Sequence, residues 1–203
     1  MNVLVLGASG KTGRQVLDQA RAAGNTVTAF VRDPEKLDRD DVAVAIGDAR
    51  NVEDLRKALR GQDAVISTLG TGLNANQKLI EGSTEALLEA MRSTGVKRLV
   101  MLSTFAASPT YQATGIMKLA NIAMKGIVTD KTAGEMLLKR SDVDWTIVYA
   151  SRLTDGPRTS GYRTVDGTLT DVGTISRADL ADALLSTLSD ATSVRQSRVV
   201  TSR

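Results

Sequence analysis

The sequence contains neither cysteine nor histidine among its 203 residues. The lack of cysteine excludes disulfides, iron–sulfur clusters and cysteine nucleophiles. The lack of histidine excludes a catalytic triad built on imidazole, and a transition-metal site would need carboxylates alone, which is unusual. We therefore expect no metal site. Any proton donor must be a lysine, a tyrosine, an acid, a hydroxyl relay or water.

Long apolar runs and strong charge are absent as well. No run is long enough to cross a membrane, and Met1 leads directly into a predicted strand, so we expect no membrane anchor, no signal peptide and a cytoplasmic location. The net charge is only +3 and the basic residues are dispersed, so we expect no nucleic-acid partner. A chain of this length that is 42% hydrophobic predicts a single domain over residues 1–203.

The most informative stretch is a glycine-rich turn near the start of the chain. An apolar run at residues 3–6 leads into Gly7, Gly10 and Gly13, and an amphipathic run follows at residues 14–20. This pattern predicts a strand, a tight turn and a helix. Gly7 would allow the turn, Gly10 a close approach of backbone N–H groups to phosphate, and Gly13 close packing of helix on strand. The turn and the positive end of the helix predict a pyrophosphate site.

Two other interpretations apply to this turn. The sequence Gly10-Lys11-Thr12 resembles the end of the phosphate-binding loop of NTPases, but that loop needs a glycine where Val5 stands. The turn could also bind no ligand at all. Its position between a predicted strand and a predicted helix favours the dinucleotide interpretation.

Strands and helices alternate along the rest of the chain. Strands are predicted at residues 25–31, 42–46, 63–68, 98–102 and 144–150, with short ones at 162–165 and 198–201. Helices are predicted at residues 52–59, 76–94, 115–140 and 176–189. This alternation predicts an α/β fold, with a Rossmann-like, doubly wound parallel sheet and helices on both faces.

Ligands bind at the carboxyl ends of the strands in such a sheet. Arg32 ends the second strand and Lys36 follows one turn later, which favours a 2′-phosphate and hence NADP over NAD; a solvated arginine is the alternative. Asp48 follows the third strand and either accepts from the adenine amino group or belongs to the start of the next helix. Residues 115–128 are apolar nearly all round, which indicates a lid or a partner-binding face as much as core.

Eight short motifs together resemble a known family. They are Gly-Ala-Ser-Gly-Lys-Thr-Gly-Arg (7–14), Val-Arg-Asp (31–33), Gly-Asp (47–48), Gly-Gln-Asp-Ala-Val-Ile (61–66), Leu-Gly-Thr (69–71), Val-Thr-Asp-Lys (128–131), Leu-Thr-Asp (153–155) and Ile-Ser-Arg-Ala-Asp-Leu (175–180). The chain resembles the atypical short-chain dehydrogenase/reductases that bind NAD(P)H, and among them the flavin and biliverdin-IXβ reductases. The resemblance implies a monomer with NADP(H) along the strand tips, a permissive pocket over the nicotinamide, and substrate-side segments at about 105–130 and 150–170.

The resemblance also implies site residues by position. Cofactor contacts fall on the glycine-rich turn, the strand tips and the later loops: Gly7, Ser9, Gly10, Lys11, Thr12, Gly13, Arg32, Lys36, Asp48, Ala49, Leu69, Gly70, Thr71, Lys131, Ser151 and Leu153. The catalytic positions fall on Ser103, Thr104, Lys131 and Arg152. The last two replace family histidines. Arg152 stays charged, so it would orient an acceptor carboxylate or stabilise a reduced flavin rather than donate a proton. Lys131 would anchor the nicotinamide ribose, or it is an exposed helix lysine.

The tyrosine–lysine pair of the wider superfamily is missing. The residues four positions after Tyr111, Tyr149 and Tyr162 are Gly115, Leu153 and Asp166. This counts against alcohol dehydrogenase or epimerase chemistry, in which a phenol exchanges a proton with the substrate. It suits hydride transfer to an extended conjugated acceptor that takes its proton from solvent.

The sequence therefore favours an NADPH-dependent reductase of a flavin, a bilin or a quinone, with FMN or FAD as substrate rather than as a bound prosthetic group. The alternative is a non-catalytic NADP(H) sensor of the NmrA-like type, with residues 115–128 as the face that binds a partner. A third interpretation is an isomerase or dehydratase on the same scaffold. We expect a monomer, with a dimer through residues 115–128 as the alternative.

Overall fold

The computed structural model describes residues 1–37, 39–70, 78–109, 124–165 and 173–202. Its strands are β1 (Asn2–Leu6), β2 (Thr26–Val31), β3 (Ala43–Ile46), β4 (Ala64–Ser67), β5 (Arg98–Thr104), β6 (Asp144–Ala150), β7 (Arg152–Thr154), β8 (Tyr162–Val165), β9 (Thr174–Ser176) and β10 (Gln196–Ser202). Its α-helices are α1 (Lys11–Ala22), α2 (Val52–Leu59), α3 (Leu79–Thr94), α5 (Lys125–Lys139) and α6 (Arg177–Ser189). Three 3-10 turns are η1 (Pro34–Lys36), η2 (Phe105–Ala107) and η3 (Ala191–Ser193).

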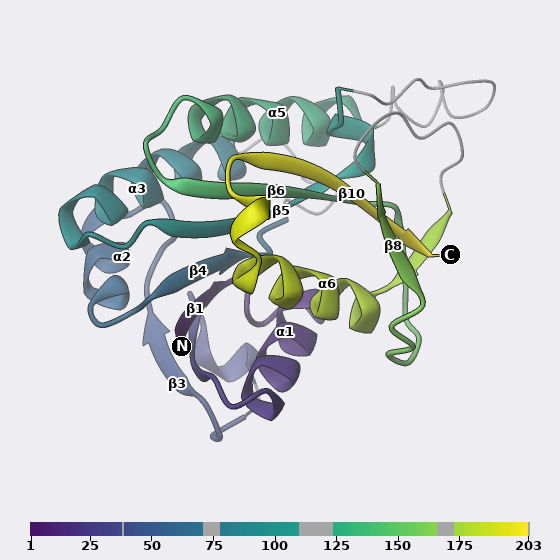
Figure 1. Cartoon of the computed structure of the whole chain (residues 1–203). Coiled ribbons are helices and arrows are strands. Elements are labelled where there is room, and N and C mark those ends of the chain that lie inside the picture. Colours follow the sequence, from purple (N-terminus) through teal and green to yellow (C-terminus); the bar gives the residue numbers. More distant parts are fainter. Residues whose placement is uncertain (38, 71–77, 110–123, 166–172, 203) are drawn as a thin grey trace.

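The main sheet has eight strands in the order β3-β2-β1-β4-β5-β6-β10-β8 (Figure 1). Every neighbouring pair is parallel except β10 and β8. The chain leaves β1 toward β2 and β3 on one side and returns to β4, β5 and β6 on the other. The order therefore reverses between β1 and β4, which is where a doubly wound sheet opens its ligand crevice.

Helices cover both faces of the sheet, as the alternating pattern predicts. Apolar residues of α1 and α6 pack on one face, and those of α2, α3 and α5 pack on the other (Figure 1). The predicted doubly wound α/β fold is therefore confirmed. Among the described residues, no helix combines the length and the apolar character needed to cross a membrane.

Within the described part of the chain, α2 and α6 each begin with an N-cap residue whose side chain accepts from the helix backbone. Asn51 accepts from the backbone N–H groups of Glu53 and Asp54 at the start of α2. Ser176 accepts from the N–H of Asp179 at the start of α6. Each cap satisfies N–H groups that have no partner inside the helix.

The structure corrects the sequence-based prediction in two places. The sheet is not wholly parallel, because β8 runs antiparallel to β10 at its edge. Residues 152–154 form β7, which pairs with β9 in a separate two-stranded sheet, where the sequence indicated a loop. Three-residue strands are too short for an alternating pattern to be read from sequence. The first parts of the predicted helices at 115–140 and 76–94 lie outside the described residues.

Candidate functional site

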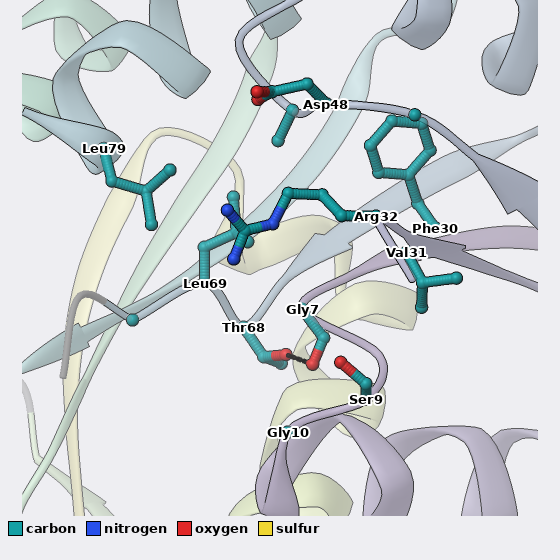
Figure 2. Close-up of a pocket in the computed structure, with 13 residues that line it drawn as sticks. Gly7, Ser9, Gly10, Phe30, Val31, Arg32, Asp48, Thr68, Leu69 and Leu79 are labelled. Atoms are coloured by element: carbon teal, nitrogen blue, oxygen red, sulfur yellow. Dashed lines mark hydrogen bonds between the residues drawn. The ribbon is translucent and has the colours of Figure 1, made fainter. Parts of the chain in front are cut away.

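A pocket opens at the carboxyl ends of β1, β2, β3 and β4, where the strand order reverses (Figure 2). Its lining combines the glycine-rich turn with the three following strand tips and the start of α3: Gly7, Ser9, Gly10, Phe30, Val31, Arg32, Gly47, Asp48, Ala49, Thr68, Leu69, Gly70 and Leu79. Eight of the residues that the sequence assigned to the cofactor thus meet in one pocket. They are Gly7, Ser9, Gly10, Arg32, Asp48, Ala49, Leu69 and Gly70.

The turn after β1 leaves no room for side chains at its glycines. Gly7 has a φ of 75°, and a Cβ there would lie 2.9 Å from the backbone and hydroxyl of Thr68. A Cβ on Gly13 would lie 2.3 Å from the carbonyl oxygen of Gly7. The N–H of Gly10 donates to that same oxygen at 3.0 Å, and α1 begins at the next residue. The turn therefore presents bare backbone at a helix N-terminus, which suits a phosphate group.

Arg14, which the sequence prediction did not assign to the site, fastens two loops of this pocket. Its Nε donates to the carbonyl oxygen of Ser9 at 3.2 Å, and its terminal nitrogen donates to the carbonyl oxygen of Lys36. The guanidinium thereby links the glycine-rich turn to η1, which begins two residues after Arg32. Its position one residue after the third glycine was the only signal in the sequence.

Arg32 and Asp48 face the pocket from neighbouring strand tips. Figure 2 shows the Arg32 side chain extending across the middle of the pocket toward Leu69. The Asp48 carboxylate accepts from Nε and the terminal nitrogen of Arg50 at 3.2 and 2.9 Å. Hydrogen bonds from Arg50, with a smaller attraction from Arg32, lower the pKa of Asp48. Asp48 is therefore an ionised acceptor at the rim of the pocket.

Lys36, Lys11 and Thr12 lie beside the pocket rather than in its lining. Lys36 is exposed and pairs with Asp33 at 3.3 Å. Lys11 pairs with Asp155 at 2.7 Å, which connects the start of α1 to the segment after β7. Thr12 is buried in the first turn of α1 together with Gly13.

Lys131 continues the site beyond Leu69. Its Nζ donates to the carbonyl oxygens of Leu102 at 3.1 Å and Leu69 at 3.3 Å. The residue is only 8% exposed, so the alternative of an exposed helix lysine is wrong. Burial lowers the pKa of Lys131 to about 8, while attraction to Glu135 and Asp130 opposes that shift.

Glu135, one helical turn after Lys131, is a second residue that the sequence prediction missed. Its carboxylate accepts from Ser103 Oγ at 2.5 Å and from the Tyr149 hydroxyl at 2.6 Å. Ser103 and Tyr149 are register partners on β5 and β6, so one carboxylate holds hydroxyls from two adjacent strands. Burial raises the pKa of Glu135, and these hydrogen bonds oppose the rise. Its spacing of four residues from Lys131 was the available signal.

The remaining predicted site residues stand apart from the described lining of the pocket. Thr104 is half-buried and precedes η2, without a side-chain cap bond there. Ser151 is buried, and its hydroxyl has no hydrogen-bond partner within the described part of the chain. Arg152 is exposed and Leu153 is half-buried, both on β7. Thr71 lies outside the described residues.

Comparison with known proteins gives a family match over most of the chain. A family model described as NAD(P)H-binding matches residues 7–191. The chain is 28% identical over 170 residues to the uncharacterized protein YwnB of Bacillus subtilis (strain 168), covering 80% of this chain and 78% of that one. It is 29% identical over 163 residues to the photosystem II assembly factor Ycf39 of Synechocystis, covering 77% of this chain and 46% of that protein.

Solved structures match the fold along the whole chain. The oxidoreductase YlbE from Lactococcus lactis has a TM-score of 0.86 at 22% identity, covering 100% of this chain and 91% of that one. ChuY, described as an anaerobilin reductase from Escherichia coli O157:H7, has a TM-score of 0.84 at 23% identity, covering 100% and 97%. A short-chain dehydrogenase/reductase from Veillonella parvula in complex with NADP has a TM-score of 0.80 at 18% identity, covering 98% and 94%. At these identities the structures show a shared fold.

Proposed function

Because the chain belongs to the NAD(P)H-binding family, we propose that it is an NADPH-dependent reductase that transfers hydride to a conjugated acceptor such as a flavin, a bilin or a quinone. The observation that carries the proposal is the pocket at the switch point, where the glycine-rich turn, Arg32 and Asp48 meet. Lys131 lies next to this pocket, because its Nζ donates to the carbonyl oxygen of Leu69 in the lining. The pocket therefore offers phosphate-binding backbone and two opposite charges, and a buried cation lies beside it.

The donors and spaces of this pocket fit NADP(H). The turn at Gly7 and Gly13 has no room for a Cβ, so its backbone would hold the pyrophosphate at the start of α1. Arg32 would pair with the 2′-phosphate and Asp48 would accept from the adenine amino group. Lys131 would donate to the nicotinamide ribose. When bound, NADPH supplies the hydride.

The residues beyond the cofactor pocket would receive the acceptor. Ser103 or Thr104 would hold the nicotinamide amide or the acceptor, and Arg152 would orient an acceptor carboxylate. The segments at about 105–130 and 150–170 would form the substrate side of the domain. In this arrangement the protein contributes binding, orientation and electrostatics.

The burial and hydrogen bonding of Tyr149 support an acceptor that takes its proton from solvent. The Tyr149 side chain is 1% exposed, and its hydroxyl donates to Glu135 at 2.6 Å. Burial and the Glu135 charge raise its pKa. A phenol held in this way is unsuited to proton exchange with a substrate alcohol, which favours flavins, bilins and quinones over sugar or alcohol substrates. The description of ChuY as an anaerobilin reductase supports including bilins.

The test is a panel of acceptors. Purified protein is mixed with NADPH, and FMN, FAD, biliverdin and a simple quinone are offered in turn while loss of nicotinamide absorbance is followed. Turnover with any of them, and little with NADH, is the expected result. Tight NADPH binding without turnover on the whole panel would instead favour the NADP(H)-sensor alternative. No binding of either nicotinamide cofactor would refute both.

A further inference from the structure

Glu135 occupies a place in the site that the proposed function leaves without a role. Its side chain is 2% exposed, and both of its oxygens accept hydrogen bonds, one from Ser103 and one from Tyr149. Hydrogen bonds donated to both oxygens of a carboxylate favour its ionised form. A buried negative charge of this kind is costly unless an opposite charge lies nearby.

Lys131 is a buried cation near Glu135. It lies one turn earlier on α5, so both side chains project from the same face of the helix. The hydrogen-bond partners of the Lys131 ammonium are both neutral: the Leu102 carbonyl on β5 and the Leu69 carbonyl after β4. Lys139, one turn farther along α5, also lowers the pKa of Glu135, and its effect on Glu135 is larger than that of Lys131. Glu135 is nevertheless the acid that acts most strongly on Lys131.

Asp130, the other acid near Lys131, forms hydrogen bonds with the start of α3. Its carboxylate accepts from the backbone N–H groups of Ile80 and Glu81, each at 3.0 Å. These bonds cap the first turn of α3 from outside, where N–H groups lack partners within the helix. Asp130 keeps its charge and also favours the ammonium form of Lys131, but Glu135 has the larger effect.

We propose that Glu135 is a positioning residue: it fixes the Ser103 hydroxyl and supplies negative charge that helps to keep Lys131 an ammonium ion beside the cofactor pocket. The Lys131 ammonium has three N–H groups, and two are used by the Leu102 and Leu69 carbonyls. The third is the one that would meet the cofactor. This inference rests on the proposed function for its ligand, but the charge coupling belongs to the protein alone.

The coupling has a definite sign. Burial lowers the pKa of Lys131 to about 8, and the Glu135 charge keeps it from falling farther. Replacing Glu135 by glutamine removes the charge but preserves the size of the side chain. The Lys131 pKa then falls below its present value, and Lys131 loses its proton near neutral pH. NADPH binding that depends on the ammonium ion is lost as pH rises, and in the variant this loss begins at lower pH.

The first measurement uses the full, cofactor-free chain. Lysine side chains are labelled at Cε with ¹³C, and the Lys131 signal is assigned with Lys131→Arg and titrated between about pH 6 and pH 10.5. We expect a midpoint near the value of about 8 in the wild type. In Glu135→Gln we expect it to move down by about one unit or more. An unchanged midpoint would overturn the proposal.

The second measurement follows NADPH binding against pH. In Glu135→Gln we expect NADPH binding to be lost at lower pH than in the wild type, by the same amount as the fall in the Lys131 midpoint. The double variant Lys131→Arg/Glu135→Gln should show no such loss below about pH 10, because arginine stays charged. If NADPH binds at no pH, the proposed function fails, whereas the cofactor-free titration still decides the role of Glu135.

Two controls separate charge from structure. Glu85→Gln removes an exposed carboxylate from α3, and we expect it to leave the Lys131 midpoint in place. Should Glu135→Gln not fold, the coupling is measured in reverse by ¹³C titration of the Glu135 carboxyl in Lys131→Met. Loss of the cation should raise the Glu135 pKa above its wild-type value. An unaltered Glu135 titration would overturn the proposal.

Discussion

A Cβ placed on Gly13 would lie 2.3 Å from the carbonyl oxygen of Gly7. A change of side-chain rotamer cannot relieve that contact, because the opposing atom belongs to the backbone. The first turn of α1 therefore packs directly on the turn that follows β1. The same packing aims the start of α1 at the pocket.

Gly13→Ala should consequently damage both the fold and the site. We expect a loss of about 1–3 kcal/mol in the free energy of unfolding, as for overpacked interiors. We expect NADPH binding to weaken at least about tenfold, or about 1.4 kcal/mol. The matched control is Gly82→Ala in α3, whose Cβ would meet the Arg50 side chain at 3.7 Å. Normal NADPH affinity in Gly13→Ala would contradict this account of the turn.

Arg32 should distinguish the two nicotinamide cofactors. Its guanidinium lies in the pocket (Figure 2), and the proposed partner is a 2′-phosphate that NADH lacks. Arg32→Ala should weaken NADPH binding by about 1.5–3 kcal/mol, the value of a hydrogen bond to a charged group, and leave NADH binding nearly unchanged. Fluorescence titrations with both cofactors measure this, with Arg60→Ala on the surface as control. An equal loss for both would remove the 2′-phosphate role.

Arg152 should affect the choice of acceptor. It is exposed on β7, outside the described lining of the cofactor pocket, so its proposed partner is an acceptor carboxylate. Arg152→Ala should raise the apparent KM about tenfold for anionic acceptors such as biliverdin, which corresponds to about 1.4 kcal/mol, and spare neutral quinones. Steady-state kinetics with both kinds of acceptor test this. Parallel changes, or none, would make Arg152 a structural residue.

Asp179 should give the protein part of its resistance to acid. Burial raises its pKa, but hydrogen bonds from Thr159, Ser160 and Ser176 outweigh that effect and hold the pKa below its ordinary value. A carboxylate with a lowered folded pKa stabilises the fold above its unfolded pKa of about 3.9. That stability is lost as pH falls through the folded pKa.

Asp179→Asn tests this contribution. At pH 7 we expect the variant to be about 1–3 kcal/mol less stable in urea unfolding, because the N–H groups of Thr159 and Ser160 lose a charged acceptor. The difference should shrink in titrations near pH 3. The exposed Asp142→Asn should show a much smaller difference at both pH values. A difference for Asp179→Asn that does not depend on pH would contradict the assignment.

The sequence predicted those parts of the site that depend on local pattern. The glycine spacing predicted the turn at Gly7, and the positions of Arg32 and Asp48 after strands placed them at one sheet edge. The contacts of Glu135 depend instead on how α5 packs over β5 and β6. Ser103 and Tyr149 are 46 positions apart and meet only through strand register. No local pattern contains that information.

The same distinction explains the other differences. Lys131 carries a side chain that is usually exposed, and only the packing of α5 against Leu69 and Leu102 shows that it is buried. Strands β7 and β9 each have three residues, and their pairing is set by the path of the chain after β6. Long-range packing therefore determines the features that the sequence prediction missed.

The most direct test of the central claim is calorimetric titration of the intact chain with NADPH and, in parallel, with NADH. The account predicts one binding site per chain and an NADPH affinity at least about tenfold higher than that for NADH, a difference of about 1.4 kcal/mol. A lack of NADPH binding, or tighter binding of NADH, would contradict the assignment of the pocket at Gly7, Arg32 and Asp48 to NADP(H).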